Sequence, residues 1–159
     1  MKKAKSKFYS SSETKSEVQD NVVSYQTAFS NLTSIEVSDM DVLNLIRMGI
    51  PKLEFDNIMQ MIGFSYEEMS ALMHVSERTL RRFDDSTHLN IEQSERMVEI
   101  KKLYLFGTEV FDSLETFKQW IETPIMALGY QKPKQFLDTS LGIRMLTNLL
   151  GRIQQGVYS

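Results

Sequence analysis

The 159-residue sequence predicts an all-α fold, a helical bundle without a sheet. Apolar residues recur at spacings of three and four along successive segments of about 10 to 20 residues, which is the pattern of amphipathic helices. Residues that favour helix caps precede several of these segments, and glycine or proline follows them. No stretch shows the apolar-polar alternation of a half-buried strand. We therefore expect helices joined by short turns throughout the ordered part of the chain.

Residues 1–36 are predicted to form a disordered, basic and serine-rich tail. Four lysines lie within the first seven positions, serines fill positions 10–12, and no sustained apolar periodicity follows. The lysines could form an arm that contacts DNA phosphates. A solvated terminus that only aids solubility is the favoured alternative.

Two helices are expected in the next part of the chain. The first begins at Ser38 and ends before Gly49, where the following proline also stops it. Its apolar face is predicted to consist of Met40, Leu43 and Ile46. The second helix covers residues 53–62 with the same periodicity, and Gly63 closes it.

The stretch from Phe64 to Phe83 predicts a short helix, a tight turn and a second helix. Ser65 can cap the first helix, with Glu68 returning a bond to the cap, and Ser76 can cap the second. The apolar residues fall on faces that can pack together: Met69, Leu72, Met73, Val75, Leu80 and Phe83. This arrangement is typical of a helix-turn-helix, whose second helix enters the major groove of DNA.

The outward face of that second helix carries the candidate DNA-binding residues. They are Ser76, Arg78, Thr79, Arg81 and Arg82. Arginine and threonine near the start of such a helix reach base edges, and flanking arginines meet phosphates. Two features oppose this interpretation, because His74 occupies the turn where glycine is usual and acidic neighbours cancel the arginines. The pattern also fits two helices that only support a core, and tight DNA binding would need a dimer or an additional basic arm.

The pair Asn90 and Gln93 indicates the start of a long helix that runs toward Phe111. Apolar residues at helical spacing support this helix: Met97, Ile100, Leu103, Tyr104 and Phe106. We place the helix-turn-helix domain at residues 37–111. A small helical C-terminal domain is expected at residues 112–159.

The C-terminal domain is predicted to begin with three short helices. Asp112 with Glu115 marks the start of the first. Pro124 is expected at the first position of the second, which ends at Gly129, and Pro133 begins the third.

The final helix is predicted to start at a cap formed by Asp138 or Thr139 and to run to about Gln155, where Gly156 ends it in a left-handed turn. Its inward face consists of Ile143, Leu146, Leu150 and Ile153. Its outward stripe consists of Arg144, Asn148, Arg152 and Gln155. The chain then ends at Val157-Tyr158-Ser159, and an aromatic beside a terminal carboxylate suggests docking in its own core or in a partner's pocket. On physical grounds alone the first is favoured.

Composition excludes several classes of protein. Hydrophobic residues make up 42% of the chain and charged residues 25%, as in ordinary soluble proteins. A net charge of -3 argues against a uniformly basic nucleic-acid binder. The absence of cysteine excludes disulfides, thiolate nucleophiles and cysteine-ligated zinc. No apolar run approaches membrane-spanning length, so we expect a cytoplasmic protein without a membrane partner.

The sequence does not predict an enzyme. The only histidines, His74 and His88, fall in a turn and a loop, and no Ser/His/Asp arrangement is present. Carboxylates fall on solvated helix faces rather than in pairs. No catalytic residue, metal site or cofactor is therefore expected.

Two ordered sets of residues resemble one known family. The first consists of Trp120-Ile121, Thr123-Pro124, Ala127-Leu128-Gly129, Pro133, residues 136–139, Gly142, residues 149–153 and residues 156–159. It is similar to the toxin-binding domain of Xre/MbcA/ParS-type antitoxins. The second consists of Gly49-Ile50-Pro51, Val75-Ser76, residues 78–82 and residues 94–96, and it resembles the Xre-like helix-turn-helix of the same family. The likeness covers about residues 37–159, with Tyr130 departing where a second glycine often follows Gly129.

The resemblance implies an antitoxin whose partner is a RES-domain toxin, an NAD-consuming enzyme encoded beside it. It implies that the C-terminal domain covers the NAD pocket of that toxin. The candidate toxin-binding residues are Arg144, Asn148, Arg152, Gly156, Val157, Tyr158 and Ser159. The family also implies a homodimer that represses its own operon, with recognition helices one duplex turn apart. Two alternatives remain: a transcription regulator whose C-terminal domain only dimerises, without a toxin partner, and an antitoxin whose helix-turn-helix has become structural.

Overall fold

The computed structural model describes residues 38–156, so the predictions for residues 1–36 and for Val157, Tyr158 and Ser159 lie outside the described residues. The chain divides into two units, Met1–Val42 and Leu43–Ser159, which are described separately. In the described part of the first unit, α2 (Asp39–Met48) begins. The Ser38 hydroxyl accepts a hydrogen bond from the Asp41 amide at 3.2 Å and donates one to the Asp41 carboxylate at 2.7 Å. The predicted start of the first helix at Ser38 is confirmed.

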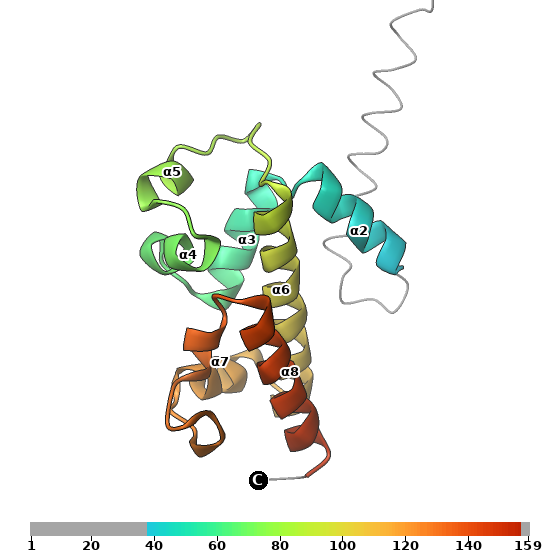
Figure 1. Cartoon of the computed structure of the whole chain (residues 1–159), viewed down its shortest axis with the longest axis vertical. Coiled ribbons are helices and arrows are strands. Elements are labelled where there is room, and N and C mark those ends of the chain that lie inside the picture. Colours follow the sequence, from blue (N-terminus) through green and yellow to red (C-terminus); the bar gives the residue numbers. More distant parts are fainter. Residues whose placement is uncertain (1–37, 157–159) are drawn as a thin grey trace, which may run out of the picture. The chain divides into compact units, whose positions relative to one another are not determined.

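The second unit is built of helices (Figure 1). Its elements are α3 (Lys52–Ile62), α4 (Tyr66–Met73), α5 (Glu77–Arg81), α6 (Ile91–Phe111), α7 (Leu114–Glu122), the 3-10 helices η1 (Met126–Leu128) and η2 (Pro133–Phe136), and α8 (Ser140–Gln154). Between residues 38 and 156 no strand forms, and only two isolated bridges occur, Pro51 with His88 and Ile125 with Gln131. The all-α prediction is confirmed. No helix in this range is long and apolar enough to cross a bilayer.

Helix α6 is the element against which α3, α7 and α8 all pack. Figure 1 shows α8 running alongside α6. The predicted start of α6 is confirmed, because Asn90 accepts a hydrogen bond from the Gln93 amide at 2.8 Å and Gln93 accepts one from the Asn90 amide at 3.2 Å. Most of the predicted apolar positions of α6 are buried, so the helix lies in the core rather than on the surface.

Aromatic side chains fill the contact between α6 and α7. The Tyr104 ring meets Phe117 edge-on at 5.0 Å between centroids and Phe64 edge-on at 6.4 Å. Burial raises the pKa of the Tyr104 phenol, and its hydroxyl has no hydrogen-bond partner among the described residues. Trp120 stacks on Phe117 at 5.7 Å and extends the cluster along α7. These rings fix how α7 lies on α6.

The structure tests the four helix starts that were predicted in the C-terminal half. Asp112 does not cap α7, since it closes α6 with a φ of +58°, and Ser113 caps α7 by accepting from the Thr116 amide at 3.0 Å. Pro124 does not begin a helix, because η1 starts later, after Ile125. Pro133 does occupy the first position of η2. Thr139 is the cap of α8.

The apolar face predicted for the first helix is also wrong at Met40, which is 61% exposed, and at Leu43. Leu43 is 38% exposed, whereas Leu45 is 2% exposed. Spacings of three placed Leu43 on the inward face, but the buried position lies two residues further along the helix. A ten-residue helix with apolar residues on both sides does not define its inward face by sequence alone.

Candidate functional site

Helices α4 and α5, with the turn between them, form the helix-turn-helix that the sequence predicted. Ser65 accepts a hydrogen bond from the Glu68 amide at 3.2 Å, and Glu68 accepts one from the Ser65 amide at 2.8 Å, which completes a capping box. Ser76 caps α5 by accepting from the Thr79 amide at 3.1 Å. Leu80 is fully buried beneath α5. The helix ends at Arg81, shorter than the predicted extent toward Phe83.

His74 closes α4 in the left-handed conformation, with a φ of +52°. Its Nε2 lies 3.1 Å from the Asp138 carbonyl oxygen, just before α8. In the tautomer that carries a proton on Nε2, the ring donates a hydrogen bond to this carbonyl. A glycine in the turn would relax the backbone but could not make this contact, so His74 connects the turn to the C-terminal half.

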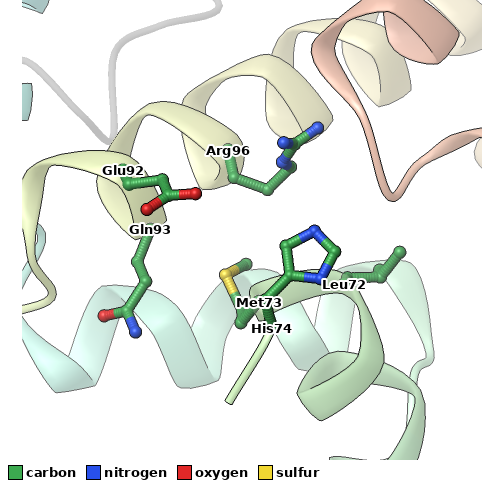
Figure 2. A pocket seen from close by; sticks show the side chains of 6 residues that line it. All are labelled: Leu72, Met73, His74, Glu92, Gln93 and Arg96. Atoms are coloured by element: carbon green, nitrogen blue, oxygen red, sulfur yellow. The ribbon is translucent and has the colours of Figure 1, made fainter.

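A small hollow lies beside His74, between the end of α4 and the first turns of α6 (Figure 2). Its lining residues are Leu72, Met73, His74, Glu92, Gln93 and Arg96. The hollow encloses about 170 Å³ including open solvent, less than the ~300 Å³ of a typical small-molecule site. Arg96 Nη1 is buried there without a hydrogen-bond partner among residues 38–156, and Glu99 Oε2 lies 3.9 Å away. The geometry does not define a ligand site.

The candidate DNA-binding residues share the surface of α5 but differ in their availability. Arg78, Arg81 and Arg82 are all exposed. Arg81 donates from Nε and Nη2 to the Glu77 carboxylate at 2.7 and 2.5 Å, and its guanidinium lies 4.6 Å from the Tyr66 ring centre. The hydroxyls of Ser76 and Thr79 bond each other at 2.7 Å.

Arg78 and Arg82 make no ion pair with any residue in the described part of the chain. They are therefore the cations most available for phosphate on this face. Sequence spacing placed Arg78, Arg81 and Arg82 on one surface. It did not show that Glu77 forms an ion pair with Arg81.

Lys134 on η2 joins the turn helices to the C-terminal helices. Its ammonium group forms ion pairs with Glu68 on α4 and Glu122 on α7, and it lies 4.4 Å from the centre of the Phe64 ring. Burial alone would lower the pKa of Lys134, but the hydrogen bonds to Glu122 and Glu68 raise it. Burial would likewise raise the pKa of Glu68, but the bonds from Lys134 and the Ser65 amide lower it. Sequence reasoning missed this cluster, since no local pattern relates residues 66 positions apart.

Helix α8 presents its predicted polar stripe to solvent. Arg144, Asn148, Arg152 and Gln155 are all exposed, and Gly156 ends the helix with a φ of +72°. On the opposite side Ile143, Leu146 and Leu150 are buried against the core, while Ile153 is half-buried. Thr139 caps the helix by accepting a hydrogen bond from the Gly142 amide at 3.1 Å. The structure therefore places the described candidate toxin-binding residues on one accessible face.

Two large apolar residues on the same face were missed by the sequence prediction. Leu141 is 58% exposed and Met145 is 43% exposed. They continue a row with Asn148 and Arg152 at spacings of four, three and four, so these residues lie above one another on the helix surface. This periodicity was available in the sequence, but the prediction assigned neither residue to a face of the helix.

The fold and the two surfaces define a class of protein: a helix-turn-helix joined to a helical domain with an accessible polar and apolar face. Family models match both parts. Residues 41–100 match the antitoxin Xre-like helix-turn-helix domain, and residues 107–156 match the antitoxin Xre/MbcA/ParS C-terminal toxin-binding domain. The chain belongs to the Xre/MbcA/ParS family of antitoxins, and its C-terminal domain is the toxin-binding domain of that family.

Three sequence relatives of this chain carry antitoxin names. The Antitoxin Xre of Photorhabdus laumondii is 26% identical over 117 residues, which cover 72% of this chain and 79% of the relative. The Antitoxin Xre of Yersinia enterocolitica is 27% identical, covering 74% and 81%. A protein of Sphingobium named "Prs ADP-ribosylating antitoxin" is 24% identical, covering 77% and 83%. The solved MbcT-MbcA toxin-antitoxin complex of M. tuberculosis contains a chain with 18% identity and a TM-score of 0.48, covering 65% of this chain and 93% of that one.

Proposed function

We propose that this antitoxin neutralises a RES-domain, NAD-consuming toxin by covering the toxin's NAD pocket with its C-terminal domain. In this proposal the antitoxin acts by binding and catalyses nothing itself. The name of the Sphingobium relative refers to ADP-ribosylation, a reaction that uses NAD as its donor. Both partners would meet in the cytoplasm, where NAD and the shared operon are found.

The accessible face of α8 is the observation that carries this proposal. Arg144 and Arg152 offer guanidinium groups that pair well with carboxylates and phosphates. Asn148 lies between them, and Leu141 and Met145 add apolar surface that would be buried in a complex. Gly156 ends the helix beside this row with a left-handed backbone, at a φ of +72°. A polar and apolar row of this kind suits the charged rim and the apolar interior of a dinucleotide pocket.

Deletion of Val157 to Ser159 tests the inhibitory end directly. The truncated protein should fold with an unchanged melting temperature but fail to protect NAD from the purified product of the neighbouring reading frame. The substitution Arg152→Ala should weaken protection about tenfold or more, because a charged group would be lost from the interface. The exposed neighbour Gln154, on another side of α8, supplies the matched control Gln154→Ala, which should protect as the original chain does. Full protection by the truncated chain would sink the pocket-covering mechanism.

We also propose that the helix-turn-helix half binds the promoter of its own operon as a homodimer. Arg78 on α5 and Arg82 directly after it, which make no ion pair within residues 38–156, support DNA contact, while the short helix and its acidic neighbours support the need for a second copy. In the competing hypothesis the C-terminal domain only dimerises a transcription regulator. That hypothesis requires tight operator binding and no complex with the neighbouring gene product, so the same purified toxin separates the two.

A further inference from the structure

Residues 125–131 form a closed turn that displays two large side chains. The Ile125 amide donates to the Gln131 carbonyl at 3.2 Å, the Tyr130 amide to the Ile125 carbonyl at 2.9 Å, and the Gly129 amide to the Met126 carbonyl at 2.9 Å. Tyr130 is 73% exposed and Met126 is 67% exposed. Every hydrogen bond named here is made by the backbone, so neither side chain is needed to close the turn.

Tyr130 adopts a backbone conformation that disfavours it. Its φ is +61°, in the left-handed region, directly after Gly129 at +65°. For a bulky residue this conformation is an outlier, whereas glycine adopts it without a steric penalty. An exposed tyrosine at this position gains little packing in return. Backbone strain that packing within the protein does not offset indicates that the residue serves a contact with another molecule.

We propose that Tyr130, together with Met126, is an anchor that inserts into an apolar recess on the toxin, as a second point of attachment besides α8. The inference rests on the proposed function, because it takes the toxin as the occupant. The occupant follows from the position of the turn, which lies within residues 107–156, the toxin-binding domain. Tyrosine suits this role, since its ring buries a large area with few rotatable bonds and its hydroxyl can pair at the edge of the recess.

The strain and the proposed contact make opposite predictions for one substitution. Tyr130→Gly relieves the backbone and removes the ring, so the melting temperature should rise by about 2–4 °C while the Kd for the toxin weakens at least tenfold. Tyr130→Asn, which tolerates the left-handed region, should weaken binding in the same way. Met126→Ala should weaken it several-fold. A tyrosine kept only for its own fold would instead lower the melting temperature when replaced.

Asp112 provides the matched control, because it also has a left-handed backbone, with a φ of +58°, and an exposed side chain. Asp112→Gly should raise the melting temperature without changing the Kd. Binding is measured by calorimetry with the purified product of the neighbouring reading frame. An unchanged Kd for Tyr130→Gly and Tyr130→Asn, or a fall in melting temperature for Tyr130→Gly, overturns the anchor while leaving the α8 mechanism intact. Failure of the original chain to bind this toxin overturns both.

Discussion

Gly107 leaves no room for a methyl group near the C-terminal end of α6. A Cβ at this position would lie 2.3 Å from two carbons of the Phe117 ring, which is fully buried. The glycine therefore lets α7 approach α6 closely and lets Phe117 reach the aromatic cluster around Tyr104. A glycine inside a helix normally costs stability, and here the close contact offsets that cost.

The substitution Gly107→Ala should destabilise the fold by about 2 kcal/mol or more, because the ring or the helix must shift. Urea unfolding at equilibrium measures this change. Gly151 on α8 is the matched control, since a Cβ there would meet nothing within 4 Å. Gly151→Ala should stabilise the fold by about 0.5–1 kcal/mol, as expected for glycine in a helix interior. Equal effects at the two positions would show that Gly107 is not needed for packing.

At the scale of single residues, the sequence predicted what is local. The caps Ser65, Ser76 and Asn90 depend on groups three residues away, and all three are confirmed. Asp112 and Ser113 are both good caps, so their order depended on where α6 ends, which packing decides. The hydrogen bond between His74 and the Asp138 carbonyl had no local signal, because it joins residues 64 positions apart.

At the scale of elements, the ion-pair cluster of Lys134, Glu68 and Glu122 shows how the two halves of the second unit are held together. One ammonium group pairs with carboxylates from α4 and α7 and covers the Phe64 ring. The sequence predicted the helices and most of the faces of α8, because periodicity defines a helix face. It could not predict which helices share an ion pair, because that depends on the tertiary arrangement.

The ion-pair cluster around Lys134 predicts that the stability of the fold depends on pH. The pKa of Glu68 is lowered from 4.5, so its contribution is present above that value and is lost as pH falls through the lower pKa of the folded state. The pKa of Lys134 is raised from 10.5, so its contribution is present below that value and is lost as pH rises through the higher pKa of the folded state. Between these limits Lys134→Met should cost about 1 kcal/mol, since the carboxylates are partly exposed and solvent screens them.

Urea unfolding of the original chain and of Lys134→Met across the pH range measures this contribution. The difference in unfolding free energy should be constant near neutral pH and should shrink in acid below about pH 4.5. Lys132, whose ammonium group lies 3.4 Å from the Glu122 carboxylate alone, provides the control Lys132→Met with a smaller effect. A difference that does not change with pH would mean that the Lys134 side chain acts only by packing.

At the scale of the whole molecule, the proposed DNA contact and the proposed toxin contact involve different surfaces. The first surface is α5 with its arginines, and the second is the outer face of α8 with the turn around Tyr130. The resemblance of the sequence to antitoxins predicted that one surface binds DNA and another binds the toxin. Membership of the antitoxin family is confirmed. The partner, the operator and the residues in contact stay predictions, because they depend on molecules other than this chain.

Substitutions on α5 should affect DNA alone. Arg78→Ala with Arg82→Ala should weaken binding to the DNA upstream of its own operon and lower the salt slope of log K by about 2 per protomer, one for each lost phosphate contact. Arg81→Ala should have a smaller effect, because Glu77 already pairs with this arginine. Fluorescence anisotropy at several salt concentrations measures the slope. Toxin neutralisation should be unchanged in both variants, and an Arg81→Ala effect as large as the double substitution would contradict this assignment.

The continuity of α6 bears on how such a protein is removed by the cell. The same 21-residue helix packs against α3, α7 and α8, so neither half keeps its interior if the helix is severed. Under the proposed function, a protease that cleaves α6 would therefore end promoter binding and toxin binding together, and no half-active fragment would survive.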